Sequence, residues 1–248
     1  MRVVALYDIH GNIDALEAVL ADPRVVDADA IVVGGDAVPG RFANAVLDRL
    51  EALDVPVTWV RGNGEREVVE ALDFTELPDV DDLAAHTAAL SAAELGEERA
   101  RSLAGLPTSV VLDGVRYCHA SPRRDDEMLT KATPTERWAS ALVNVEEPVV
   151  VVGHTHQQSF RVIGEIRVVN AGSVGLPYEG ELDVACWLEV DAGTPTLRRT
   201  SYDSAAAGRR MLDAGWPDPR SIDAALVDPV EPGEITAFFE GLVEPDPA

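Results

Sequence analysis

Five short motifs along the sequence carry carboxylate, amide or imidazole side chains, and each follows a run of apolar residues. Two of them, Asp8-Ile9-His10 and His154-Thr155-His156, place two polar side chains at positions i and i+2, which project from the same side of an extended backbone. The other three motifs supply one such side chain each. The seven candidate ligands are Asp8, His10, Asp36, Asn63, His119, His154 and His156, and they include four of the chain's five histidines.

This set of side chains is typical of a site for two divalent cations. Neutral imidazoles combined with hard oxygen ligands suit Mn, Fe, Zn, Ni or Co, whereas an all-oxygen shell would suit Mg or Ca. Two cations about 3.5–4 Å apart need a bridging anion, and the carboxylate of Asp36 can donate one lone pair to each. We therefore predict two divalent transition-metal ions, with Mn as the first choice and Fe, Zn, Ni or Co as the alternatives.

The elements that position these side chains follow from the apolar pattern. Up to Val60, buried strands alternate with helices. Such alternation implies a parallel sheet whose functional loops lie at the carboxyl ends of the strands. Asp8, Asp36 and Asn63 should therefore converge. The predicted elements are strands at 2–7, 30–35 and 55–60 and helices at 14–20 and 43–53.

The remainder of the chain changes from helical to β texture and back. Alanine-rich residues from 65 to about 105 predict a helical insertion beside the site, and a helical tail is predicted from about 204. We expect a single domain over 1–248. Between the helical parts we predict strands at 109–112, 115–119, 149–152, 160–163, 166–170, 184–190 and 197–202, with hairpin turns at Asp113-Gly114 and Gly164-Glu165.

The net charge of the chain limits the kinds of molecule that the protein is expected to bind. The formal net charge is −24, and Lys131 is the only lysine. Such a surface repels polyanions, so we expect no binding to duplex nucleic acid. A small phosphate ester drawn to bound cations is the expected partner. The acidity fits a high-salt habitat and equally a genome that favours arginine over lysine.

The expected compartment follows from what the sequence lacks. No apolar run approaches the roughly 20 residues of a membrane helix, and the N-terminus does not resemble a secretory leader. Cys118 and Cys186 make no disulfide framework, and Cys118 is expected as a buried thiol on the strand before His119. We predict a cytoplasmic protein without membrane contact; its oligomeric state stays open.

The ordered series of motifs resembles the calcineurin-like metallophosphoesterase superfamily, and the resemblance covers nearly the whole chain. The fragments 8–12, 153–156 and 170–175 are most similar to its compact bacterial and archaeal phosphodiesterase-type members. The fold that this resemblance implies is an α/β, four-layer α/β/β/α sandwich of two mixed β-sheets flanked by helices.

The resemblance also implies a role for each candidate ligand. One metal would be held by Asp8, His10, Asp36 and His156, and the other by Asp36, Asn63, His119 and His154, with Asp36 as the bridge. Hydroxide between the two metals would attack phosphorus in line. Asp36, Asn63 and His119 are the implied catalytic residues, because their metal positions phosphate oxygens.

One position departs from the family pattern. Gly64 stands where the family often has a histidine that protonates the leaving oxygen. Loss of a general acid typically costs about 10²–10⁴-fold, and least for a good leaving group, so a phosphodiester substrate is preferred. Glu65 is expected to cap a helix N-terminus. His86 is a candidate replacement acid, and Arg123 and Arg41 are candidate phosphate contacts.

Two alternatives to a phosphodiesterase remain at this point. One is a phosphomonoesterase of the protein-phosphatase or dinucleoside-polyphosphatase type. The other is a non-catalytic interaction module on the same fold, as in the phosphoesterase-like subunit of retromer. Such modules tend to erode the ligand series, whereas here all seven ligand positions hold competent residues, which favours an enzyme.

Overall fold

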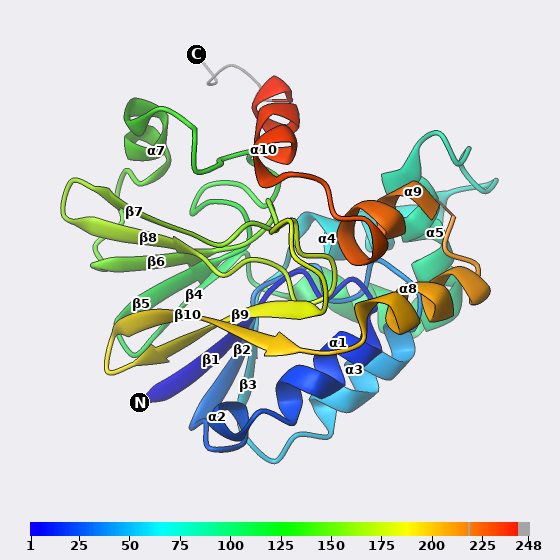
Figure 1. The fold of residues 1–248 in the computed structure, drawn as a ribbon, viewed down its shortest axis with the longest axis horizontal. Helices are drawn as coiled ribbons and strands as arrows, with labels where there is room; N and C mark the ends of the chain where they lie inside the picture. The colour runs from blue at the N-terminus through cyan, green and yellow to red at the C-terminus, as the bar shows by residue number, and fades with distance from the viewer. Residues whose placement is uncertain (218, 243–248) are drawn as a thin grey trace.

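The computed structural model describes residues 1–217 and 219–242 and contains two mixed five-stranded β-sheets flanked by helices (Figure 1). The inward faces of the two sheets share one apolar core. Val3, Ala5 and Tyr7 of the first sheet meet Tyr117 and Val151 of the second in that core. The α/β four-layer sandwich expected from the sequence is confirmed.

The first sheet places the N-terminal strands at its centre. Strands β1, β2 and β3 run parallel, and β9 and β10 add an antiparallel pair beside β1. Because successive strand residues face opposite sides, Val4 and Leu6 turn outward toward the helices while Val3 and Ala5 turn inward. In spatial order the strands are β10 (Thr194–Ser201), β9 (Val184–Asp191), β1 (Arg2–Leu6), β2 (Ala30–Val33) and β3 (Val57–Trp59).

The second sheet combines two hairpins with parallel central strands. Strands β5, β6 and β8 run parallel, and β4 and β7 pair antiparallel at the edges. The predicted turn between β4 and β5 has positive φ at Asp113 (51°) and Gly114 (75°), the backbone that a two-residue hairpin of type I′ requires. In spatial order the strands are β4 (Ser109–Leu112), β5 (Val115–Cys118), β6 (Val149–Val152), β8 (Ile166–Asn170) and β7 (Ser159–Ile163).

Helices cover the outer faces of both sheets. Between the sheets' strands along the chain lie α1 (Ile13–Leu20), α2 (Pro23–Val26), α3 (Ala43–Glu51), α4 (Asn63–Glu70), α5 (Leu83–Leu95), α6 (Glu97–Ser102) and α7 (Thr135–Ala141), with short 3₁₀ turns at Ala71–Asp73 and Leu103–Gly105. The C-terminal part contains α8 (Ser204–Asp213), α9 (Pro219–Ile222), a π-helical turn at Asp223–Val227 and α10 (Pro232–Gly241). None of the helices in the described part of the chain is long and apolar enough to cross a membrane.

The helical segment after β3 differs from the prediction in one respect. Helices fill most of 65–105, but 74–82 has no helix. Pro78 lacks the N–H that a helix interior needs, and Asp82 instead caps the start of α5 by accepting a hydrogen bond from the Ala85 N–H (3.2 Å). Helices α2 and α7 were not predicted, because both are too short for a clear periodic pattern.

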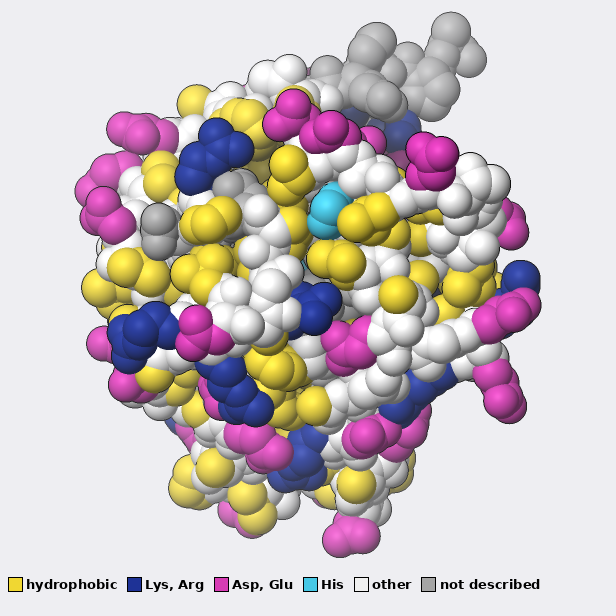
Figure 2. Space-filling model, turned by 90° about the vertical axis from the view of Figure 1, so that its right-hand side faces the viewer, with side chains coloured by type: hydrophobic (Ala, Val, Ile, Leu, Met, Phe, Trp, Pro, Cys, Tyr) yellow, Lys and Arg dark blue, Asp and Glu magenta, His cyan; other side chains and the backbone are white. Residues whose placement is uncertain are grey.

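The surface carries the acidity seen in the sequence. On the face formed by α5, α8 and α9, acidic side chains surround the outline and basic side chains are interspersed among them (Figure 2). Several arginines of the described chain make ion pairs with acidic side chains, such as Arg99 with Asp48 (2.6 Å) and Arg210 with Asp14 (2.6 Å).

Candidate metal centre

The candidate ligands lie together at the carboxyl ends of strands from both sheets. Asp8 and Asp36 follow β1 and β2, and Asn63 begins α4 shortly after β3. His119 and His154 follow the parallel strands β5 and β6. The packing of the two sheets against each other therefore brings residues more than a hundred positions apart into one cluster, as the Asp8 carboxylate accepting the His154 N–H (2.9 Å) demonstrates.

The backbone of this cluster is unusual. Five of the seven candidate ligands have a left-handed backbone, which non-glycine residues rarely adopt. The φ angles are 53° at Asp8, 48° at His10, 53° at Asp36, 67° at His154 and 56° at His156. Such conformations cost about 1–3 kcal/mol each and concentrate at functional sites, where the surrounding structure enforces them. The left-handed backbone at the strand ends therefore directs these candidate ligand side chains toward the centre, at a cost in conformational energy.

The ligand atoms form two adjacent groups of three. Within each group the atoms lie within 4.8 Å of one another; the groups are Asp8, His10 and His156, and Asp36, His119 and His154. Asp36 faces both groups, since its Oδ2 lies 3.5 Å from His119 Nε2 and 3.8 Å from His10 Nε2. Asp36 therefore lies between the two candidate metal-binding groups.

Three of the imidazoles are oriented from behind by main-chain carbonyls. In each, Nδ1 donates a hydrogen bond and Nε2 is left facing the centre. The acceptors are the carbonyls of Pro39 for His10 (3.0 Å), Gly34 for His119 (3.0 Å) and Leu176 for His156 (2.7 Å). Such contacts fix the tautomer whose Nε2 lone pair can bind a metal, and they hold the ring in place.

Several buried polar atoms in the centre have no hydrogen-bond partner in the described chain. They are Asp8 Oδ1, Asn63 Oδ1, His119 Nε2 and His154 Nε2. The other end of the Asn63 amide is occupied, because Nδ2 donates to Glu67 Oε1 (3.1 Å). Leaving such groups unsatisfied costs about 1–3 kcal/mol each. All four atoms are metal-ligand atoms in their unprotonated form, and cations at this point would satisfy them together.

The pKa values of Asp36, His119 and His154 are shifted in the directions expected of a site that binds positive charge. Burial alone would raise the pKa of Asp36, but the charge of His119 lowers it overall. Burial opposes the charge on His119 in turn, yet Asp36 raises the pKa of this imidazole to about 10. Burial, helped by His119, lowers the pKa of His154 to about 4. Without a metal, the Asp36–His119 pair therefore holds a proton in the place that a cation would take.

Gly64 occupies a position with no room for a side chain. A Cβ atom built there would lie 2.0 Å from Cγ of Pro39 and 2.8 Å from Oδ1 of Asp36. The Gly64 N–H also donates to that Oδ1 (2.7 Å). A histidine side chain therefore has no room at this position, and the main chain of Gly64 helps to hold Asp36.

The sequence of residues 1–193 matches the family model of the calcineurin-like phosphoesterase superfamily domain. The chain belongs to this family. Members of this family are metal-dependent, and the protein is a phosphoester hydrolase with two candidate metal-binding groups. A search of curated proteins found no match to the sequence.

Solved structures agree with the family assignment. A metallophosphoesterase from Sphaerobacter thermophilus is 24% identical, with 93% of this chain and 99% of that chain covered and a TM-score of 0.76. A hypothetical protein from Pyrococcus horikoshii OT3 is 21% identical, with 91% and 98% covered and a TM-score of 0.73. At these identities the similarity establishes the fold.

A hollow of about 290 Å³ opens beside the second group of ligands in this calcineurin-like site. Ligand residues Asn63 and His154 form its inner wall. Its other described lining residues are Glu67, Arg124, Asp126, Glu127, Met128, Arg137 and Leu242. The volume is near the lower end of the range for small-molecule sites, about 300–1,000 Å³. The hollow therefore adjoins the candidate ligands Asn63 and His154.

The arginines in this hollow are not those that the sequence singled out. Arg124 and Arg137 line it, whereas Arg123 binds Glu127 (Nε to Oε2, 2.9 Å). Arg123 and Arg124 both lie in a tight turn, in which the Ser121 N–H donates to the Arg124 carbonyl (3.0 Å). Consecutive residues in such a turn point in different directions, and no periodic signal in the sequence reveals which one faces the site.

The other two candidate contacts lie elsewhere. The main chain of Arg41 packs beside Gly11, next to the ligand His10, and its buried Nε has no hydrogen-bond partner in the described chain. Arg41 is thus on the His10 side of the centre, away from the hollow. His86 lies in α5, where its Nδ1 donates to the Pro78 carbonyl (2.8 Å). This contact gives the imidazole of His86 a role in holding the 74–82 segment.

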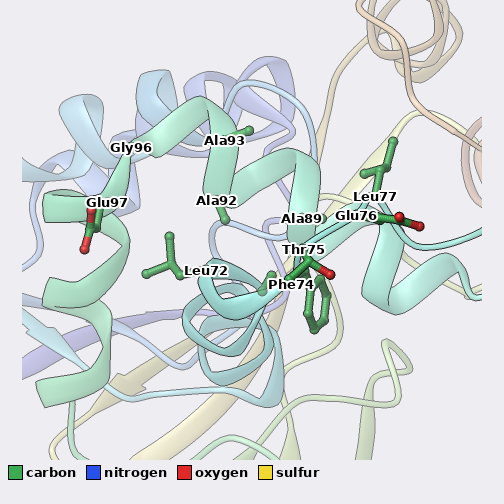
Figure 3. A pocket seen from close by; sticks show the side chains of 11 residues that line it. Leu72, Phe74, Thr75, Glu76, Leu77, Ala89, Ala92, Ala93, Gly96 and Glu97 are labelled. Carbon is green, nitrogen blue, oxygen red and sulfur yellow. The ribbon is translucent and has the colours of Figure 1, made fainter.

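A second hollow of about 420 Å³ is separate from the metal centre (Figure 3). It lies between the alanines of α5 and the segment 71–77, with Leu72, Phe74 and Leu77 among its lining residues. None of the seven candidate ligands lines it.

Proposed function

We propose that this phosphoester hydrolase is binuclear and prefers phosphodiesters. The observation that carries the proposal is a pair of adjacent ligand groups, with Asp36 facing both and with several buried ligand atoms that have no hydrogen-bond partner in the described chain. One cation would be held by Asp8, His10, Asp36 and His156, and the other by Asp36, Asn63, His119 and His154. Mn is the first choice, because imidazole and carboxylate ligands suit such transition ions.

The chain's own residues prepare the site in three ways. Main-chain carbonyls keep the Nε2 atoms of His10, His119 and His156 facing the centre. Glu67 turns the Asn63 amide so that its Oδ1 points inward. When bound, two such cations lower the pKa of water and neutralise phosphate oxygens. Arg124 and Arg137 line the hollow where the substrate's oxygens can accept hydrogen bonds.

The preference for diesters is supported by Gly64. A phosphomonoester with a poor alkoxide leaving group depends most on a general acid, and the family histidine that would supply it has no space here. Activated diesters depend least on such an acid. A cytoplasmic site of action is part of the proposal and is supported by Cys118 and Cys186, which are both buried free thiols.

Metal reconstitution tests this function. Protein stripped of metal and reloaded with Mn should hydrolyse bis-4-nitrophenyl phosphate faster than 4-nitrophenyl phosphate. Asp36→Asn should abolish activity and lower metal content, whereas Asp27→Asn, at an exposed position, should change neither. Faster hydrolysis of the monoester would favour the phosphomonoesterase alternative. Metal binding without activity on either ester would favour a non-catalytic interaction module.

A further inference from the structure

The C-terminal helix α10 lies outside the matched family domain but is tied to the metal centre. In Figure 1 it stands above the loops that leave the carboxyl ends of the strands. Thr236 in α10 donates to Gln157 Oε1 (2.7 Å), and Gln157 directly follows His156. The Gln157 amide also donates to the carbonyls of Pro232 (2.8 Å) and Tyr178 (3.1 Å). The first turn of α10 is therefore fixed to a residue adjoining a candidate ligand.

Two further contacts hold the rest of α10. Glu240 accepts hydrogen bonds from the hydroxyls of Thr130 (2.5 Å) and Thr133 (2.6 Å), which lie in the loop between β5 and α7. Phe239 lies against Tyr178, with ring centroids 6.2 Å apart. Tyr178 is in turn stacked on the imidazole of His156 at 5.2 Å. Helix α10 is thus anchored to two loops that flank the centre.

This anchoring sets the position of one side chain at the substrate hollow. Leu242 directly follows α10 and lines the hollow together with Asn63 and His154. Leu242 and Met128 provide its apolar lining, while Arg124 and Glu67 are among the donors and acceptors of its polar lining. A ligand there meets hydrogen-bond donors, acceptors and a small apolar surface within about 290 Å³.

We propose that α10, through Leu242, limits the size of the organic group on the scissile phosphate. The inference rests on the proposed phosphoesterase function and names its substrate class: a small phosphate ester whose organic group is compact. Such a group is small enough for the hollow, where Arg124 and Glu67 are among the polar lining residues. The side chain of Leu242 would also keep polymeric phosphodiesters out of the hollow.

The test compares two symmetrical diesters, bis-4-nitrophenyl phosphate and bis-1-naphthyl phosphate, in the Mn-loaded enzyme. Because each variant is compared with wild type on the same ester, differences in leaving-group reactivity cancel. Leu242→Ala should raise kcat/KM for the naphthyl ester relative to the nitrophenyl ester by about three- to tenfold. Leu242→Trp should shift the same ratio in the opposite direction. Phe238→Ala is the matched control, since Phe238 is exposed on α10 and does not line the hollow.

Binding separates failure of this inference from failure of the proposed function. Calorimetry with phenyl phosphate and 1-naphthyl phosphate should show weaker binding of the naphthyl compound to wild type and a smaller difference in Leu242→Ala, whether or not the esters turn over. An unchanged naphthyl-to-phenyl ratio in both Leu242 variants overturns the inference while leaving phosphoesterase activity intact. Hydrolysis of a single-stranded oligonucleotide as fast as the nitrophenyl ester also overturns it.

Discussion

The carboxylate of Glu65 accepts a hydrogen bond from the main-chain N–H of Asp36 (2.8 Å), the residue that faces both groups of candidate ligands. The same carboxylate accepts from the N–H groups of Ala37 (2.8 Å) and Gly62 (2.8 Å). Glu65 therefore caps α4, as the sequence predicts, and also joins the loop after β2 to the loop after β3. Burial, together with the neighbouring charge of Asp36, raises the pKa of this carboxyl.

Glu65→Gln should destabilise the fold and weaken metal binding together. The amide would turn an NH₂ group toward main-chain N–H donors, and buried charge-assisted hydrogen bonds contribute about 1.5–3 kcal/mol each. We expect a loss of about 2–4 kcal/mol in the free energy of unfolding and a lower Mn content after dialysis. Glu70→Gln is the control, because its carboxylate is 57% exposed. Equal stabilities for the two variants would show that Glu65 does not hold the loops.

Gly64→Ala should displace Asp36 rather than merely fill space. The added Cβ would meet the rigid ring of Pro39 at 2.0 Å, and overpacking of this kind costs about 1–3 kcal/mol. Chemical unfolding and metal content measure both effects. Gly105→Ala serves as the control, since nothing lies within 4 Å of the Cβ it would add. If Gly64→His were stable and more active on monoesters, the space at this position would be larger than the structure indicates.

Removing bound metal ions should lower the Tm, and the metal-free protein should bind at least one more proton than the metal-bound protein. In the metal-free protein Asp36 raises the pKa of His119 to about 10, against the effect of burial, so His119 carries a proton at pH 8. A metal needs the neutral imidazole, and binding should therefore release at least one proton. Calorimetry of Mn binding at pH 8 in buffers of different ionisation enthalpy measures this number. A binding enthalpy that does not depend on the buffer would contradict it.

The sequence could predict that the candidate ligands lie together, because a local pattern encodes their positions. A residue directly after a parallel strand must lie at the edge where neighbouring strands also end, so Asp8, Asp36 and His119 could be placed together without knowing any loop. The wall of the hollow could not be predicted in this way. Whether Arg123 or Arg124 faces it depends on one turn, and the contribution of Leu242 depends on long-range contacts such as that between Thr236 and Gln157, 79 residues apart.

Asp22 should make the stability depend on pH in the acid range. Its pKa is lowered to about 2, chiefly by the hydrogen bond from Arg24, against the opposing effect of burial. A carboxyl with a lowered pKa contributes stability that is fully present above its unfolded pKa of about 3.9 and is lost as the pH falls through about 2. Because Arg24 is 41% exposed, solvent screening limits the effect to about 1 kcal/mol.

Urea unfolding of wild type and Asp22→Asn should show a stability difference that is constant from pH 7 to 5 and narrows below pH 4. A difference that grows with acidity would contradict this sign.

Salt should stabilise the protein rather than weaken it. Surface ion pairs such as Arg210–Asp14 lose strength when screened, but each is worth only about 0–1 kcal/mol. The formal net charge of −24 produces repulsion over the whole surface, and raising the ionic strength from 0.1 to 1 M shortens the screening length from about 10 to 3 Å. We therefore expect the Tm to rise between 0.1 and 1 M KCl, measured with metal occupancy held constant. Uncharged sucrose, which stabilises by exclusion from the surface, is the comparison, and its effect should be the same at both salt concentrations. A Tm that falls with KCl would mean that the ion pairs outweigh the net repulsion.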